Sequence, residues 1–89
     1  MGEINEMEIL NSFFTFRASY WSCIKELDTP ERQLKYFYAI CNFAFEGKET
    51  DFENDLEMKR MFILTKEQIL RDFKRQKKGL PQWYINSNL

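Results

Sequence analysis

The sequence predicts an all-α fold, a small bundle of three main helices that leaves room for a short fourth helix at the N-terminus. Apolar residues recur at helical spacing in three segments, and capping residues and glycines mark the segment ends. The chain has 89 residues, of which 44% are hydrophobic, and this suits one small domain. Rings that each bury about 150–250 Å² make an efficient core at this size. We expect residues 1–79 to form the domain and residues 80–89 a C-terminal tail.

The first main helix is predicted over about residues 15–27. Phe16, Tyr20, Ile24 and Leu27 recur at steps of four, four and three, which is the spacing of one helical face. Upstream, the run "ILNSFFTF" is compatible with either a helix or an extended segment. The first dozen residues are accordingly predicted to form a short helix or a frayed arm.

The second helix is predicted to run from Pro30 to about Glu46. Asp28 or Thr29 can accept a hydrogen bond from the first free amides, and proline suits the first helical position, where its missing N–H costs nothing. Gly47 is expected to end the helix by adopting the left-handed backbone conformation.

This second helix is apolar on two sides. At about 100° per residue, one side is an ordinary core stripe of Leu34, Phe37, Tyr38, Cys41, Ala44 and Phe45, of which we expect all but Ala44 among the main core residues. We expect these residues in the core together with Tyr20, Ile24, Phe52, Leu56 and Ile63. A second apolar face holds Tyr36, Ile40 and Phe43. That face is either sandwiched between helices or exposed for a partner, which includes a second copy of the chain in a homodimer.

The third helix is predicted over about residues 51–78. Thr50 and Glu53 have the spacing of a capping box, and Gly79 ends the helix. A helix of about 28 residues would be about 42 Å long, which is more than a compact domain of this size covers. We therefore expect a kink or break near Thr65, or a C-terminal half that projects.

Charge is distributed unevenly along the chain. Residues 66–89 hold six basic and two acidic residues, a net charge of +4, so residues 1–65 carry −5 of the total −1. The basic residues are Lys66, Arg71, Lys74, Arg75, Lys77 and Lys78. They are either a solvated helix end, whose cations favour the C-terminal dipole, or a strip that contacts nucleic-acid phosphates.

The tail "LPQWYINSNL" adds Trp83 and Tyr84 beside this strip. These rings could stack on bases, fold back onto the bundle, or dock onto a partner as a short peptide. A separate acidic cluster between residues 46 and 57 raises the idea of a carboxylate surface that imitates nucleic acid, although acids at a helix start are also favoured by the dipole.

Catalytic and metal chemistry is not expected. The chain has no histidine, no glycine-rich phosphate loop and no nucleophile motif, so we predict that it is not an enzyme and has neither cofactor nor metal. Cys23 and Cys41 lack Cys-x-x-Cys spacing and lie in apolar segments, which favours reduced core thiols over a disulfide. With no signal peptide and no membrane span visible in the sequence, we expect a soluble, cytoplasmic protein.

Four stretches carry a resemblance to a known family: "FFTFRASYWSCIKEL", "LKYFYAICNFAFEGKE", "MFILTKEQI" and "KRQKKG". In this order they resemble a domain of unknown function found in bacteriophages and prophages of Gram-positive bacteria, sometimes beside or fused to replication proteins. The family tends to continue with Gly-Gly and more basic residues where this chain has its tail. The resemblance implies a viral origin and a small accessory role in the cytoplasm of the bacterial host cell, and it assigns no functional residues.

The leading functional hypothesis is a small non-enzymatic accessory protein that works by binding a host or phage protein. The partner would be a replication component or a host defence complex, the latter in the manner of an anti-CRISPR inhibitor. Its expected contact residues are Tyr36, Ile40, Phe43, Trp83 and Tyr84. The alternative is a nucleic-acid-binding module that uses the basic end of the third helix.

Overall fold

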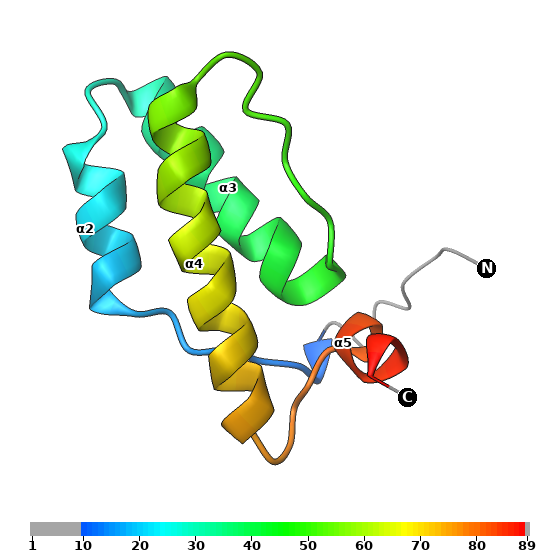
Figure 1. The fold of residues 1–89 in the computed structure, drawn as a ribbon. Coiled ribbons are helices and arrows are strands. Elements are labelled where there is room, and N and C mark those ends of the chain that lie inside the picture. Colours follow the sequence, from blue (N-terminus) through cyan, green and yellow to red (C-terminus); the bar gives the residue numbers. More distant parts are fainter. Residues whose placement is uncertain (1–9, 89) are drawn as a thin grey trace.

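The computed structural model describes residues 10–88 and confirms the all-α class. Its helices are α2 (Ala18–Glu26), α3 (Pro30–Glu46), α4 (Leu56–Arg75) and α5 (Gln82–Ser87), and no strand occurs within these residues (Figure 1). The predicted N-terminal helix or arm falls largely on residues 1–9, outside the described part.

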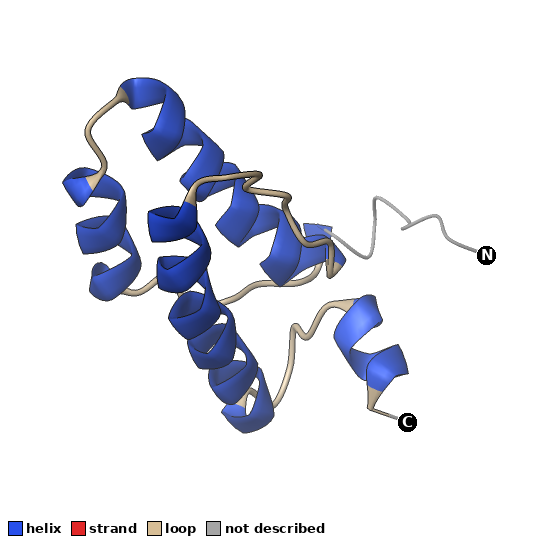
Figure 2. Cartoon of the chain, turned by 45° about the horizontal axis from the view of Figure 1, so that its top comes forward, coloured by secondary structure: helices blue, strands red, loops and turns tan. Residues whose placement is uncertain are grey.

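Both α2 and α4 pack against α3, and an extended loop returns from the end of α3 to the start of α4 (Figures 1 and 2). The short helix α5 follows a turn after α4 and lies near the C-terminal end of α3. This arrangement leaves one side of α3 facing away from its two partner helices.

The second helix has the predicted bounds. The Thr29 side chain accepts a hydrogen bond from the Arg32 amide at 3.2 Å, and Pro30 occupies the first helical position. At the other end Gly47 adopts the left-handed conformation with φ of 70°. Local capping chemistry alone therefore located both ends of α3.

The prediction for the third helix is wrong in its start and in its expected break. Residues 51–55 are not helical, and the Asp55 side chain caps α4 by accepting a hydrogen bond from the Met58 amide at 3.1 Å. The helix then continues through Thr65 to Arg75 without interruption. It neither breaks nor projects, because Ile69 and Phe73 in its second half are buried.

The predicted core is wrong for α4 and largely wrong for α3, and it is right for α2 and for Phe52 in the loop before α4. Of the expected residues, Tyr20, Ile24 and Phe52 are buried, whereas the exposed ones are Leu34, Phe37, Tyr38, Leu56 and Ile63. Cys41 and Phe45 are half-buried. The buried side of α3 carries Tyr36, Ala39, Ile40, Phe43 and Ala44 instead. The helix is thus turned so that its other apolar side meets α2 and α4.

An ion pair ties the segment before α2 to the end of α4. Arg17 donates two hydrogen bonds to the Asp72 carboxylate, from Nε at 2.7 Å and from Nη2 at 2.6 Å. The Asp72 side chain is only 9% exposed. The Arg17 hydrogen bonds, helped by one from Gln68, lower the pKa of Asp72 below its ordinary value.

This pair predicts a loss of stability in acid. Because the folded-state pKa of Asp72 is lower than its unfolded-state value near 4, its contribution is fully present above pH 5 or so and is lost as the pH falls through the folded-state pKa. In urea unfolding at a series of pH values, Arg17→Gln should lose less stability on acidification than the parent protein. The control is Arg71→Gln, which removes an exposed pair with Glu67. Equal pH dependence in parent and Arg17→Gln would contradict the assignment.

Within residues 10–88, none of the helices has the length and apolar character that crossing a bilayer requires.

Candidate interaction sites

The apolar face predicted to meet a partner lies inside the domain. Tyr36 and Ile40 are fully buried and Phe43 is 5% exposed. The Tyr36 hydroxyl is 2.8 Å from Thr65 Oγ1, and its ring stacks on Phe52 at 6.1 Å between centroids. These three residues therefore form the contact with α2 and α4, and the prediction that they bind a partner is corrected: no surface remains for it.

The opposite side of α3 is the exposed one. We call it the outer α3 face and define it by Phe16, Leu34, Phe37 and Tyr38, whose exposed fractions are 39%, 56%, 41% and 58%. The Phe16 and Phe37 rings are in contact, with centroids 5.9 Å apart. The face therefore combines one residue from the segment before α2 with three residues of α3.

The position of Phe16 is set by the segment that carries it. The Phe13 amide donates a hydrogen bond to the Gly79 carbonyl at 2.9 Å, and the Gln76 side chain donates one to the Phe13 carbonyl at 2.9 Å. Phe14 packs edge-on against Phe45 at 5.1 Å. The segment thus covers the C-terminal part of the exposed side of α3 and leaves the N-terminal part open.

The tail packs against the bundle. The Trp83 indole Nε1 donates a hydrogen bond to the Ala44 carbonyl at 3.0 Å, and its ring lies 5.2 Å from that of Phe43. Tyr84 contacts the buried Phe73, with ring centroids 5.1 Å apart. Of the options that the sequence leaves open, the structure shows Trp83 and Tyr84 half-buried in α5 on the domain itself.

A cavity of about 350 Å³ separates α5 from α4, and we call it the α4–α5 pocket. Its lining consists of Leu70, Arg71, Lys74, Trp83, Tyr84, Ser87 and Asn88. The pocket brings together basic residues and aromatic residues that the sequence analysis assigned to separate sites. The position of α5 beside the pocket depends on a long-range contact, the hydrogen bond from the Trp83 indole to the Ala44 carbonyl near the end of α3.

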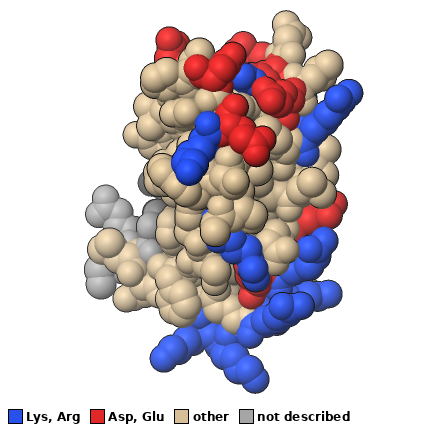
Figure 3. Space-filling view, turned by 90° about the vertical axis from the view of Figure 1, so that its left-hand side faces the viewer, with Lys and Arg blue, Asp and Glu red and all other residues tan. Residues whose placement is uncertain are grey.

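The basic residues do not form one continuous strip. Lys66 is engaged within the domain, because its Nζ pairs with Glu49 at 2.9 Å and lies 5.6 Å from the centroid of the Phe43 ring. Arg71 pairs with Glu67 at 3.5 Å. The remaining four have no ion pair within residues 10–88; they are Lys74, Arg75, Lys77 and Lys78. Figure 3 shows blue side chains gathered at the lower end of the molecule and acidic ones at the upper end.

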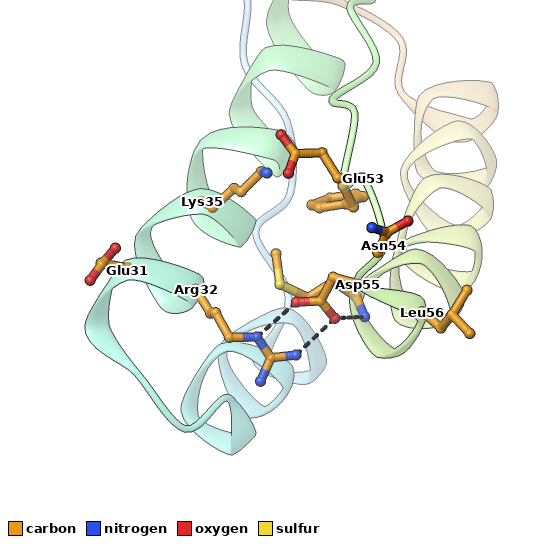
Figure 4. A pocket seen from close by; sticks show the side chains of 9 residues that line it. Glu31, Arg32, Lys35, Glu53, Asn54, Asp55 and Leu56 are labelled. Atoms are coloured by element: carbon orange, nitrogen blue, oxygen red, sulfur yellow. Dashed lines mark hydrogen bonds and ion pairs between the residues drawn. The ribbon is translucent and has the colours of Figure 1, made fainter.

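The acidic end is organised by Arg32, a role that the sequence analysis missed. Its guanidinium pairs with Asp28, Asp55 and Glu57, each at 2.8 Å. Figure 4 shows the bonds to Asp55 beside a cavity of about 590 Å³ at the start of α4. The hydrogen bonds from Arg32, and then that from the Met58 amide, lower the pKa of Asp55. Arg32 therefore neutralises part of the negative charge at this end, which weakens the idea of a carboxylate surface that imitates nucleic acid.

A third cavity, of about 360 Å³, lies between α2 and α4 and includes Tyr20, Cys23 and Thr65 in its lining. The Tyr20 hydroxyl has no hydrogen-bond partner within residues 10–88, and burial raises the pKa of Tyr20 to about 12. Cys23 and Cys41 are free, half-buried thiols whose pKa values are raised by burial. No group of three metal-ligating side chains occurs in the part of the chain that the structure describes.

Comparison with known proteins identifies a family to which the chain is similar. A model of a family of unknown function (DUF6291) matches residues 13–85, a span that includes the segment before α2, the three main helices and most of α5. Neither the curated proteins nor the solved structures contain a significant match to the chain. Because the matched span covers most of the sequence, the chain belongs to the DUF6291 family, whose function is unknown.

Proposed function

We propose that this protein is a small non-enzymatic interaction protein that binds another protein through the outer α3 face. The observation that carries the proposal is the exposure of Leu34, Phe37 and Tyr38 on a helix whose opposite side is already buried. An aromatic-rich patch of uncharged side chains is the usual composition of the centre of a protein interface.

The size of the face supports a docking role. Taking about 150–250 Å² for each fully exposed large side chain, the exposed fractions correspond to roughly 400 Å² of apolar surface. A standard interface takes about 800 Å² from each partner, with an apolar centre and a polar rim. The outer α3 face thus supplies the centre of such an interface. Glu31 and Lys35, exposed and half-buried on the same helix, supply part of a polar rim.

The resemblance to a phage domain directs the choice of partner. We propose a phage-type accessory protein whose partner is a replication component or a host defence complex. Blocking a defence complex sterically, as an anti-CRISPR inhibitor does, requires a docking face and no catalytic residue. An inhibitor of this kind should co-purify with a host nuclease complex and lower its activity.

A matched pair of charge substitutions tests the docking face. Leu34 on α3 and Ile63 on α4 are both 56% exposed, so glutamate at either position should leave the fold intact. In an affinity pull-down from the bacterial host with nuclease treatment, Leu34→Glu should reduce recovery of the protein partner at least tenfold, while Ile63→Glu should not. Circular dichroism melting controls for folding in both variants.

Equal recovery with the two variants would refute the outer α3 face as the docking site. Size-exclusion chromatography with light scattering distinguishes a second copy of the chain from a different partner. A dimer that Leu34→Glu dissociates and Ile63→Glu does not would identify the partner of this face as the protein itself.

A second candidate function is nucleic-acid binding by the basic end. The specific observation in its favour is the group of Lys74, Arg75, Lys77 and Lys78, which have no ion pair within residues 10–88. Figure 3 shows basic side chains gathered at the lower end of the molecule. Such binding would weaken steeply as salt is added, because each neutralised phosphate releases counterions.

A further inference from the structure

We propose that the α4–α5 pocket is a binding site for an unpaired nucleotide of single-stranded nucleic acid. In this site an unpaired base would lie against Trp83 and Tyr84, while its phosphate would pair with Arg71 and Lys74. The inference rests on the second candidate function and deepens it, because it names the subsite and the form of nucleic acid. The cavity of about 350 Å³ is within the usual range of small-ligand sites, about 300–1,000 Å³.

The aromatic side of the pocket is held in place before any ligand arrives. The indole of Trp83 is fixed by its hydrogen bond to the Ala44 carbonyl and by contact with Phe43. Tyr84 leans on the buried Phe73 and meets Trp83 edge-on at 5.9 Å. Both rings remain only half-buried, so part of each still faces the cavity. Rings held in this way can stack on a base without first being ordered.

The basic side of the pocket has charge to spare for a phosphate. Lys74 has no ion pair within residues 10–88, and Arg71 makes only long contacts, at 3.2 Å to Gln68 and 3.5 Å to Glu67. The acid in the same helical turn, Asp72, is already occupied by Arg17. Of the two nearby carboxylates, Asp72 is therefore neutralised by Arg17, and Glu67 reaches only Arg71, at 3.5 Å.

The surroundings of the pocket favour a strand over an isolated nucleotide. Arg75, Lys77 and Lys78 continue the positive charge from Lys74 along the end of α4 and the following turn. A track of cations beside an aromatic platform is the general arrangement of single-strand binding surfaces, since successive phosphates follow the cations and a base occupies the platform. A duplex keeps its bases stacked inside and would contact the cations alone.

Two pocket variants and one matched control test this site. Tyr84→Leu removes a ring but keeps apolar contact with Phe73, and Lys74→Gln removes the pocket cation. The control Lys77→Gln removes an exposed charge from a residue outside the pocket lining. The ligands are a fluorescent oligothymidylate of twelve nucleotides, a duplex of the same length, thymidine monophosphate and polyglutamate. Anisotropy or competition gives each Kd, and thermal melting controls for folding.

We expect the protein to bind the oligothymidylate more tightly than the duplex. Tyr84→Leu should weaken the affinity for the oligothymidylate about tenfold, and Lys74→Gln should weaken it more than Lys77→Gln does. Tyr84→Leu should leave duplex affinity unchanged. If thymidine monophosphate binds as tightly as the oligomer and the variants weaken its binding in the same way, the pocket is supported and its ligand is a free nucleotide rather than a strand.

Other outcomes overturn the pocket and separate it from the second candidate function. The pocket would be refuted if the three variants weakened salt-sensitive binding of oligomer and duplex equally, or if Tyr84→Leu did not change this binding. Either result would leave electrostatic nucleic-acid binding by the basic end standing. If polyglutamate competes as well as the oligomer, the nucleotide assignment is overturned and the ligand of the pocket is an acidic peptide. No binding of any nucleic acid at low salt would refute both proposals.

Discussion

Replacing Phe43 with alanine is expected to lower the free energy of unfolding by about 3–5 kcal/mol, whereas Phe37→Ala on the same helix should cost only about 1–2 kcal/mol. Phe43 is 5% exposed and packs between Phe62 and Trp83, so its removal leaves a cavity among rings that cannot easily close. Phe37 is 41% exposed and loses mainly its contact with Phe16. Urea unfolding followed by circular dichroism measures both values.

This pair is informative because residue type, helix and size of the change are identical. The comparison therefore isolates which side of α3 is inside. A domain of this size has roughly 5–13 kcal/mol of stability in all, so Phe43→Ala should remove a large share of it and clearly lower Tm. If Phe37→Ala proved as costly as Phe43→Ala, the outer α3 face would be covered rather than exposed, and the proposed docking surface would fail with it.

Replacing Gly47 with alanine is expected to destabilise the domain by at least about 2 kcal/mol and to release α5 from it. Gly47 has φ of 70°, a conformation that costs about 1–2 kcal/mol for a residue with a Cβ atom. A Cβ atom there would also lie 2.6 Å from Cδ2 of the Trp83 indole. The indole would have to move, and its hydrogen bond to the Ala44 carbonyl would be lost.

Tryptophan fluorescence reports the release of α5 directly. The chain has two tryptophans, so Trp21→Phe, at a position that is 54% exposed, leaves Trp83 as the single emitter. In that background Gly47→Ala should shift the emission to longer wavelength and lower Tm, while the neighbouring Lys48→Ala should do neither. An unchanged emission maximum in Gly47→Ala would mean that Trp83 is not held by the end of α3, and the α4–α5 pocket would lose one wall.

Local signals in the sequence were sufficient for the ends of α3 but not for the start of α4. The Thr29 cap, Pro30 and Gly47 act through backbone chemistry within a few residues, so no distant contact is needed to find them. Thr50 and Glu53 show the pattern of a capping box that the structure does not use. Phe52 explains the difference, because its burial against Tyr36 and Phe62 holds residues 51–55 in a non-helical path.

The side of α3 that is buried could not be chosen by periodicity, because both sides are apolar. The buried side differs from the exposed side in two ways. It carries the small residues Ala39 and Ala44, which allow neighbouring helices to approach closely, and the Tyr36 hydroxyl, which forms a hydrogen bond with Thr65. Both signals depend on what stands opposite, and a helical wheel of one segment does not contain that information. The sequence analysis therefore assigned the two sides of α3 the wrong way round. It assigned the buried side to a partner and the exposed side to the core.

A small all-helical domain, the bounds of its second helix and the basic character of one end of the chain could all be predicted from the amino-acid sequence. Those properties follow from composition and from interactions over a few residues. Two features became visible once the helices were seen packed together. They are the exposed apolar side of α3 and the pocket around which Trp83 and Tyr84 meet Arg71 and Lys74. These depend on contacts between residues far apart in the chain, such as Trp83 with Ala44 and Arg17 with Asp72, because packing selects among faces that are equally apolar when each helix is considered alone.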